Sequence, residues 1–376
     1  MSGNIDITVV EPGGTTEEAF HRLPFEIYAG NPNYVPWFTR GMHKLVAKTH
    51  PFFADADGTF LLARRDGQAV GRIAFLEPRR FNRFQNRRYA RFYFFESEDS
   101  ADVPEALFEA GRRWAKERDL DTLIGPQGFS AFSGSGILID GFEHRASMTM
   151  MPYHLPYYRG LLEGQGFEKY KDFYSALIRE GVSAPSERYE RAAEIARKRS
   201  GLDVPEIRSK RELKRIGREV VRVYNDSWHD HEEFVPLSED ETEEIIDDLL
   251  TVTVPSLVRV FRAGDEIAGF VLAFPDLSRA MIRARGRLNP VTIARLMLEK
   301  RRTRHYLVNG LGILPKYRNA GGLPLLFADV TRALRQHGAE TAEMTQIAET
   351  TDRMLSNIDK LGAEIYKTHR IYQKRV

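Results

Sequence analysis

The chain has 376 residues, of which 42% are hydrophobic and 29% charged, so it is long enough for two soluble domains and is neither disordered nor fibrous. The net charge of +2 gives no overall reason to expect a nucleic-acid-binding protein. The absence of cysteine excludes disulfides, thiolate metal sites and a cysteine nucleophile. The N-terminus lacks a signal-peptide pattern, and no apolar run reaches the roughly 18 residues of a spanning helix. We therefore expect a cytoplasmic protein.

The first half of the chain predicts a mixed α/β unit. Alternating apolar residues predict a strand at 5–10, and helical spacing predicts a helix at 17–28. Two apolar runs at 59–65 and 69–76 flank Asp66-Gly67, which favours a hairpin. The pattern then predicts a strand at 88–96, a helix at 104–118, a strand at 122–125, an apolar run at 147–151, a helix at 157–164 and a closing strand at 170–178.

The second half repeats this order of elements. It predicts helices at 213–225 and 239–250, paired strands at 257–262 and 267–274, a strand at 305–314, a helix at 323–337, a strand at 341–347, a helix at 351–361 and a last strand at 365–373. We predict an α/β fold of two similar units, 1–180 and 209–376, with a connector at 181–208 that carries a charged helix at 186–199. The alternative is that the shared order is a coincidence.

The turn KYRNAGG, between the strand that ends at Leu314 and the helix from Leu323, is the first candidate binding site. A helix N-terminus presents backbone N–H groups and a dipole that favour an anion such as phosphate. Gly321 and Gly322 let the main chain approach a ligand, and Lys316 and Arg318 add donors. The alternative is a glycine-containing loop whose cations are merely solvated.

This segment resembles the acyl-CoA-binding motif of the GCN5-related N-acetyltransferase (GNAT) superfamily: Arg or Gln, any two residues, Gly, any residue, then Gly or Ala. The segments AEMTQI and MLSNIDKLGAEIYKTHRIYQK also resemble the superfamily's opening strand and its last helix, turn and strand. The motif departs at its last position, where Leu323 is branched. The resemblance implies acyl-CoA as co-substrate and a backbone N–H within 343–347 for its carbonyl. The implied CoA-binding residues are Ile313, Leu314, Arg318, Asn319, Ala320, Gly321, Gly322 and Met344.

In the first half, LLEGQGFEKYKDFYSALI resembles the same helix, turn and strand. GPQGFSAFSGSGILIDGF stands where we expect the phosphate loop, but it lacks the Arg-led spacing. The resemblance therefore implies a degenerate unit that shapes an acceptor cleft and covers its partner's core. Phosphate binding by Gly128, Gly134 and Gly136 is the alternative.

Transfer of an acyl group from a thioester to an amine needs a neutral amine, a donor for the oxyanion and a proton for the thiolate. The family's tyrosine acid falls, by alignment, on Ile358 and Leu162, which cannot donate. Tyr366 is the nearest candidate by sequence, with an ordinary core tyrosine as the alternative.

The stretch NDSWHDHEEFVP, residues 225–236, supplies candidates for the base: His229, His231 and Glu232. A histidine near its usual pKa of about 6.5 can take a proton from an ammonium, and a carboxylate can orient it. Zinc binding and a solvated acidic loop are the rival interpretations. Because His-x-His without a third ligand is a weak signal, we expect no metal.

Six arginines between residues 79 and 91 alternate with aromatic residues, and residues 148–158 are apolar and aromatic. The arginines suit bases, an anionic lipid surface or a CoA phosphate, and the apolar stretch suits an acyl channel; a basic loop and ordinary core are the alternatives.

Over nearly its whole length the chain resembles a tandem-GNAT bacterial group that includes ceramide synthases, on NPNYVPW at 31–37, GPQGFS at 125–130 and YKTHRIY at 366–372. The resemblance implies transfer of a long-chain acyl group to the amine of a sphingoid base, with a peripheral contact at the inner membrane and no nucleic acid. It also leads us to look for an apolar tunnel that reaches the space between Ile313 and Met344. The alternatives are an N-acetyltransferase for a small or peptidic amine and a non-catalytic CoA-binding module.

Overall fold

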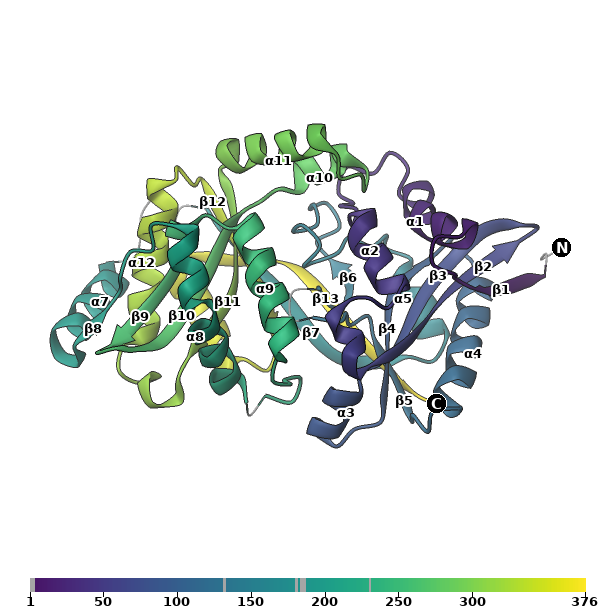
Figure 1. Ribbon diagram of the computed structural model, residues 1–376, viewed down its shortest axis with the longest axis horizontal. Coiled ribbons are helices and arrows are strands. Elements are labelled where there is room, and N and C mark those ends of the chain that lie inside the picture. The colour runs from purple at the N-terminus through teal and green to yellow at the C-terminus, as the bar shows by residue number, and fades with distance from the viewer. Residues whose placement is uncertain (1–3, 131–132, 180–181, 183–186, 230) are drawn as a thin grey trace.

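The computed structural model describes residues 4–130, 133–179, 182, 187–229 and 231–376, which form two α/β units side by side along the long axis (Figure 1). Gly181 and Pro185 of the predicted connector and Asp230 of the histidine-rich stretch lie outside the described residues.

The first unit follows the predicted order closely. Its strands are β1 (Ile5–Val9), β2 (Asp57–Arg65), β3 (Gln68–Glu77), β4 (Tyr89–Ser97), β5 (Thr122–Gly125), β6 (Ile137–Asp140) and β7 (Glu168–Ile178). Its helices are α1 (Thr15–Ile27), α2 (Thr39–Val46), the short 3₁₀ helix η1 (Pro51–Asp55), α3 (Arg79–Gln85), α4 (Asp102–Lys116) and α5 (Tyr158–Gly164). The prediction missed α2, α3 and β6. The apolar run at 147–151 is not a strand, and only an isolated bridge joins Ser147 to Met151.

The second unit repeats the main order of the first, with a hairpin, a strand–helix–strand unit and a closing strand. Its strands are β8 (Leu202–Asp203), β9 (Val258–Ala263), β10 (Glu266–Pro275), β11 (His305–Ile313), β12 (Thr341–Ala348) and β13 (Ala363–Arg375). Its helices are α7 (Glu187–Ser200), α8 (Lys210–Trp228), α9 (Glu239–Val252), α10 (Ser278–Ala284), α11 (Pro290–Arg302), α12 (Gly322–Gln336) and α13 (Asp352–Ile358), with 3₁₀ turns η2 (Pro255–Leu257), η3 (Pro315–Tyr317) and η4 (Asp359–Leu361). Two helices, α10 and α11, are absent from the prediction.

Local sequence accounts for several of these boundaries. Asp66 and Gly67 both have positive φ, which is what a two-residue β2–β3 hairpin requires. Ser209 accepts a hydrogen bond from the backbone at the start of α8, and Ser238 forms a capping box with Glu241 at the start of α9. Asn289 caps α11 in the same way, ahead of Pro290 in its first turn.

The two units share one continuous sheet, in the order β1-β2-β3-β4-β5-β13-β7-β12-β11-β10-β9-β8, with β6 also paired to β13. The closing strands are exchanged: β13, from the end of the chain, lies between β5 and β7, and β7 lies between β13 and β12. Each unit therefore completes the other's sheet. In Figure 1 the yellow β13 crosses from the second unit into the first.

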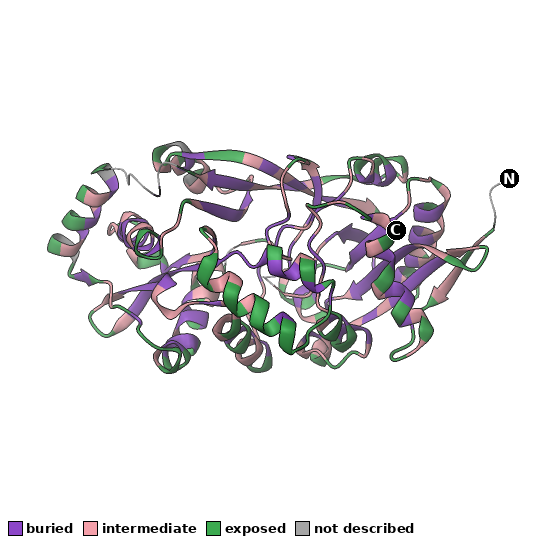
Figure 2. Cartoon of the chain, turned by 90° about the horizontal axis from the view of Figure 1, so that it is seen from above, coloured by how far each residue is buried: buried purple, intermediate pink, exposed green. Residues whose placement is uncertain are grey.

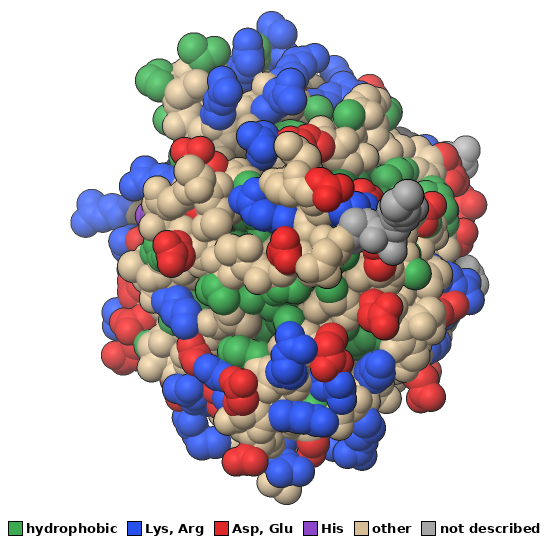
Figure 3. Space-filling view, turned by 90° about the vertical axis from the view of Figure 1, so that its right-hand side faces the viewer, with side chains coloured by type: hydrophobic (Ala, Val, Ile, Leu, Met, Phe, Trp, Pro, Cys, Tyr) green, Lys and Arg blue, Asp and Glu red, His purple; other side chains and the backbone are tan. Residues whose placement is uncertain are grey.

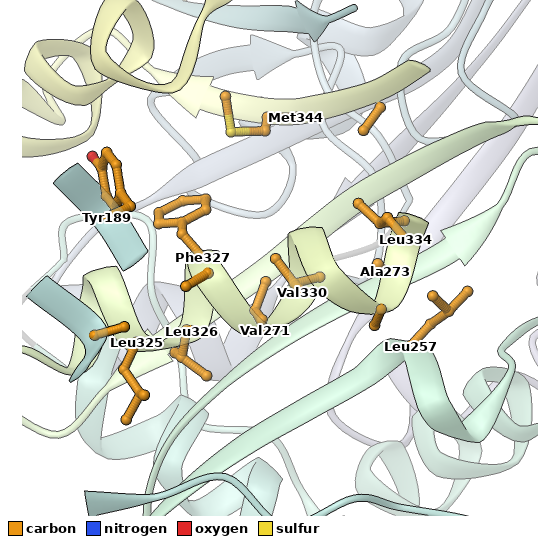
Figure 4. Close-up of a cluster of buried hydrophobic side chains, with 14 of the residues drawn as sticks. Tyr189, Leu257, Val271, Ala273, Leu325, Leu326, Phe327, Val330, Leu334 and Met344 are labelled. Atoms are coloured by element: carbon orange, nitrogen blue, oxygen red, sulfur yellow. The ribbon is translucent and has the colours of Figure 1, made fainter. Parts of the chain in front are cut away.

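Helices cover both faces of this sheet. In the first unit, one buried core contains Phe75, Phe92 and Leu107 of α4, and the opposite core contains Phe20 of α1 and Leu45 of α2. In the second unit, α12 and α7 cover one face, where Figure 4 shows Phe327 and Val330 of α12 near Val271 of β10. Helices α8 and α9 cover the other face. The strands are accordingly the most buried elements in Figure 2.

Candidate active site

The site begins where two parallel strands of the second unit separate. β11 and β12 pair from His305 with Thr341 as far as Val308 with Met344, and not beyond. Just there, β11 has a bulge: Asn309 and Gly310 stand opposite the single residue Leu272 of β10. Past this bulge the two strands are no longer paired, and residues of both strands line a cavity there, so we call this place the gap between β11 and β12.

Main-chain groups of β11 face this gap. The backbone N–H of Leu314 donates to the carbonyl of Ala268 on β10. Because main-chain groups alternate along a strand, the N–H and C=O groups of Leu311 and Ile313 face the opposite side, toward the gap. Their carbonyl groups accept hydrogen bonds from side chains: Leu311 from the Trp228 indole at 3.1 Å and Ile313 from the Arg318 guanidinium at 3.4 Å. The edge of β11 thus offers alternating N–H and C=O groups, which a ligand with amide groups can pair with as a strand would.

A largely apolar cavity of about 330 Å³ adjoins the gap. Met344, Asn309 and Leu311 line it at the gap end. Its walls include Val220, Val221 and Tyr224 of α8, Ile245 and Leu249 of α9, and Phe270 and Leu272 of β10. The first unit contributes the opposite wall with Arg80, Arg91, Gln127, Gly128, Phe129 and Phe173. The cavity reaches Met344, one of the two residues between which we looked for a tunnel, whereas Ile313 lies outside its lining.

The turn after β11 has the geometry of a helix N-terminus. Gly321 has a φ of 86° and directly precedes α12, so the amides of Gly322 and Leu323 lie at the start of this helix. The amides of Arg318 and Ala320 bond within the turn, to Pro315 at 3.3 Å and Tyr317 at 3.1 Å. Two of the expected phosphate-binding amides are therefore already used, and the two at the helix start remain suited to an anion.

The implied CoA-binding residues of the turn differ in their surroundings. Arg318 also donates at 2.7 Å to the carbonyl of Ser227, so its charge lies at the C-terminus of α8, where the helix dipole favours a cation. Leu314 is buried, with its amide bound to Ala268. Asn319 is exposed at the tip of the turn. The assignment of the whole set to CoA stays a prediction.

The expected phosphate loop of the first unit was misplaced. The equivalent of the β11–α12 turn is the segment between β4 and α4, residues 98–101, and not residues 125–142, which follow β5. This segment is acidic, and Arg65 pairs with Glu98 and Asp102 around it. Gly134 and Gly136 instead lie against the backbone of residues 149–150 and 370, so close packing explains them.

A buried polar cluster lies at the first-unit end of the cavity and centres on Glu233. Its carboxylate accepts hydrogen bonds from the Tyr170 hydroxyl and, at 2.9 Å, from the Gln127 amide. The Lys171 ammonium lies 3.9 Å away. The Glu233 side chain is only 10% exposed and lines the cavity, whereas that of Glu232 is 51% exposed and pairs with Lys171 outside the lining.

His231 lines the cavity and presents a donor to it. Its Nδ1 accepts the backbone N–H of Glu233 at 3.2 Å, so the neutral ring carries its proton on Nε2. Burial, and then the nearby Lys171 ammonium, lower the pKa of His231, which keeps the ring neutral at pH 7. Its ring also packs at 5.3 Å from that of Trp228, the residue bonded to the gap edge.

The other predicted catalytic residues lie apart from the cavity lining. His229 caps the end of α8 and packs against Phe84 and Phe234. Tyr366 lies on β13 beside His144, and burial together with Glu343 raises its pKa far above the usual range. Its neighbours Glu343 and Lys367 form a buried ion pair at 3.1 Å, each 1% exposed, bridged by Ser147. This cluster has the contacts of a structural core.

Most of the arginine-rich segment at 79–91 is neutralised. Arg79 pairs with Glu77, Arg83 with Asp55 and Arg88 with Asp121. Two of its arginines line the cavity: Arg80, which pairs with Glu241, and Arg91, whose guanidinium stacks 4.2 Å from the Phe81 ring. Burial lowers the pKa of Arg91 to about 10, so it stays charged. Residues 148–158 do not line the cavity; Met150, Met151, Tyr153 and Tyr158 are buried in the core.

The sequence did not single out Gln127, Trp228, Asn309 or Gln346. Asn309 and Gln346 bond across the start of the gap at 3.0 Å, and both line the cavity. Gln127 belongs to the loop GPQGF that the analysis had noted only for its glycines. A signal existed for Trp228, since a tryptophan at the last turn of an amphipathic helix beside a candidate site needs a partner for its indole N–H.

No family model matches the chain. It is 28% identical to a protein named bacterial ceramide synthase from Caulobacter vibrioides, over 99% of this chain and 98% of that one, and 25% identical to Protein YghO of Escherichia coli, over 96% and 93%. Among solved structures, a tandem GNAT protein from the clavulanic acid biosynthesis pathway aligns with a TM-score of 0.55 at 13% identity, over 99% and 98% of the two chains. A GCN5-related N-acetyltransferase from Sphaerobacter thermophilus aligns with a TM-score of 0.52 at 12% identity, over 99% and 95%.

These similarities confirm the predicted resemblance and the tandem GNAT fold, and they support an N-acyltransferase. Within the described residues, no helix is long and apolar enough to cross a membrane, and no group of three or more His, Cys, Asp or Glu residues could hold a metal ion.

Proposed function

We propose that the protein is an acyl-CoA-dependent N-acyltransferase that transfers a long-chain acyl group to the amine of a sphingoid base. The observation that carries this proposal is the apolar cavity of about 330 Å³ beside the gap between β11 and β12. An acetyl group needs no such space, whereas an alkyl chain gains about 0.8 kcal/mol for each methylene it buries. The relative named for ceramide synthesis, similar over nearly the full length of both chains, supports the same substrate class.

Acyl-CoA would bind along the edge of β11. Its pyrophosphate would accept from the amides of Gly322 and Leu323 at the N-terminus of α12, where the helix dipole also favours it. Its amide-containing arm would pair with the main chain of Leu311 and Ile313. The indole of Trp228 and the guanidinium of Arg318 bond to these carbonyls, so they would yield to the ligand's own N–H groups, and the Arg318 guanidinium would then pair with the pyrophosphate.

The thioester carbonyl would then lie at the start of the gap, close to Asn309 and Met344. Main-chain N–H groups that face the gap would stabilise the negative oxygen that forms during attack. The acyl chain would extend into the cavity along α8 and α9, past Val221 and Ile245.

The acceptor amine would be positioned at the polar end of the cavity. We assign the base to Glu233, because its carboxylate is shielded from solvent and faces the cavity. We assign to His231 the role of a hydrogen-bond donor, because the Nε2 of its neutral ring carries the proton. The amine nitrogen attacks the thioester carbon, its proton passes to Glu233, the carbon–sulfur bond breaks, and the CoA thiolate takes a proton from solvent.

The test uses purified protein with sphinganine and palmitoyl-CoA, and measures free CoA and ceramide together. We expect equimolar release of both. If sphinganine and palmitoyl-CoA give no product, but acetyl-CoA acylates a water-soluble amine, the long-chain assignment is wrong and a small or peptidic acceptor is favoured. No heat of CoA binding by calorimetry, and no stabilisation at excess CoA, would contradict catalysis altogether.

A hydrophobic acceptor resides in a membrane, so we also propose that the protein works in the cytoplasm at the inner face of the membrane. The arginines at 79–91 were the predicted contact, but their ion pairs argue against that role.

A further inference from the structure

Helix α11 is the most unusual surface of the molecule, because its apolar side chains point into solvent. Nine large hydrophobic residues are exposed among the described residues, and five of them lie between 288 and 298. They are 44% to 58% exposed: Leu288, Val291, Ile293, Met297 and Leu298. Single exposed apolar residues are ordinary, but a continuous group marks a contact surface.

These residues share one side of the helix. Ile293 and Met297 are four residues apart and Val291 and Leu298 are seven apart, so each pair lines up along the helix. At about 100° per residue, all four lie within about 160° of the circumference and form one broad apolar stripe. Only Thr292 of α11 is buried, and Leu296 packs partly against the core below. In Figure 1 the helix lies across the top of the molecule, and Figure 2, viewed from above, shows a largely exposed helix across this face.

The same segment concentrates positive charge. Residues 278–304 contain eight arginines and one lysine against a single carboxylate, Glu299, in a chain whose net charge is +2. All eight arginines are exposed, and among the described carboxylates only Glu340 lies within ion-pair distance of one of them, Arg304. The top of Figure 3 shows Lys and Arg side chains beside hydrophobic ones. This differs from the arginines of residues 79–91, most of which already have acidic partners.

We propose that α10 and α11 dock on the surface of an anionic lipid bilayer, with the stripe in the headgroup region and the arginines on lipid phosphates. A helix with an apolar face flanked by arginines is the form that interfacial helices take, and each basic residue near an anionic bilayer contributes about 1 kcal/mol. A second copy of the chain is a poorer occupant, since a symmetric contact would bring two sets of unneutralised arginines together. A nucleic acid would match the charge but leave the apolar stripe in water.

The position of α11 connects this surface to the cavity. Lys300 donates hydrogen bonds to the carbonyls of Thr251 and Thr253, at and just beyond the end of α9. Helix α9 lines the cavity through Ile245 and Leu249. A bilayer under α11 would therefore lie near one end of a cavity wall. The docking itself does not depend on which reaction the site performs.

The test measures binding of the full chain to vesicles by flotation, with phosphatidylcholine alone and with equal parts of phosphatidylcholine and phosphatidylglycerol. We expect binding only to the anionic vesicles. Met297→Gln with Leu298→Gln should weaken it about tenfold or more, because two exposed side chains lose their apolar contact while glutamine keeps the helix. Arg295→Gln, Arg301→Gln and Arg302→Gln together should weaken it on the order of 100-fold.

Controls change exposed apolar residues and arginines elsewhere in the chain. Val9→Thr with Ile365→Thr alters two equally exposed apolar residues, and Arg83→Gln with Arg88→Gln alters two paired arginines. Both should bind vesicles like the wild type, and all variants should keep the wild-type unfolding midpoint. The proposal is overturned if the wild type ignores anionic vesicles, if the controls lose binding equally, if the α11 variants instead change the oligomeric state in light scattering, or if duplex DNA binds and only the arginine variants weaken it.

Discussion

Filling the cavity at Val221 is the sharpest test of where the acyl chain lies. Val221 projects from α8 into the cavity and is buried without belonging to a core cluster, so a larger side chain there takes space that the acyl chain would use. Val221→Trp should exclude about three methylenes from the cavity. At about 0.8 kcal/mol each, this costs about 2.4 kcal/mol of transition-state binding. Since 1.4 kcal/mol is tenfold, kcat/KM for palmitoyl-CoA should fall about 50-fold.

The assay is the rate of CoA release across a series of acyl-CoAs from acetyl to palmitoyl, at a fixed concentration of sphinganine. Short acyl-CoAs should react with Val221→Trp as they do with the wild type, and Val221→Ala should leave the long chains unaffected. The unfolding midpoint should change little, because tryptophan would enter empty space and avoid the 1–3 kcal/mol, roughly, that overpacking costs. An unchanged acyl-length profile, with an altered preference for the length of the acceptor, would refute the assignment and give the cavity to the sphingoid chain.

Three further predictions concern single residues. Glu233→Gln should lower kcat about 100-fold by removing the base, while Glu232→Gln, at an exposed neighbour, should change it little; equal losses would contradict our choice of base. Arg318→Ala should raise KM for acyl-CoA about tenfold in steady-state assays, while Lys316→Ala, which breaks only an exposed pair, should not; unchanged kinetics would mean that the phosphates bind elsewhere. Burial lowers the pKa of His369 to about 3, so below pH 6.5 the unfolded chain binds more protons than the folded one and stability falls with acid. In urea titrations between pH 7 and 5, His369→Gln should reduce the average slope by about 1 kcal/mol per pH unit, and an unchanged slope would show that this histidine does not titrate on unfolding.

Most of the helices and strands could be predicted from the sequence, because the residues that begin and end them act locally. The hairpin at Asp66-Gly67, the strand at 122–125 and the helix from Glu239 rest on turn and capping residues that act within a few positions. Helix α11 had such signals too, in Asn289 and Pro290, but its apolar residues do not point to a core. Its existence was predictable, whereas the exposure of its apolar face depends on what the rest of the chain leaves uncovered.

The site was less predictable because it depends on contacts between distant segments. The basic turn at 316–322 and the strand at 341–347 were recognised, since each is a continuous stretch. Glu233 lies in a run of acidic residues, and nothing local shows that it is the buried one. Its carboxylate is held by Tyr170 and Gln127, which are about 60 and 100 residues away in the sequence. The base role predicted for His231 likewise rested on its residue type, and only the backbone bond to Nδ1 indicates which nitrogen holds the proton.

The exchange of closing strands explains why the first unit is needed although its β4–α4 segment is acidic. A pattern of alternating residues predicts a strand but not its partner, and the pairing of β7 with both β12 and β13 is visible only in the sheet order. Because β7 pairs with β12 at Ile347 and Ala348, it holds β12 on the side away from β11. It also carries Phe173 into the cavity and Tyr170 onto Glu233. One strand of the first unit thus supports the gap, part of the cavity wall and the proposed base, so none of these contacts requires the first unit itself to bind phosphate.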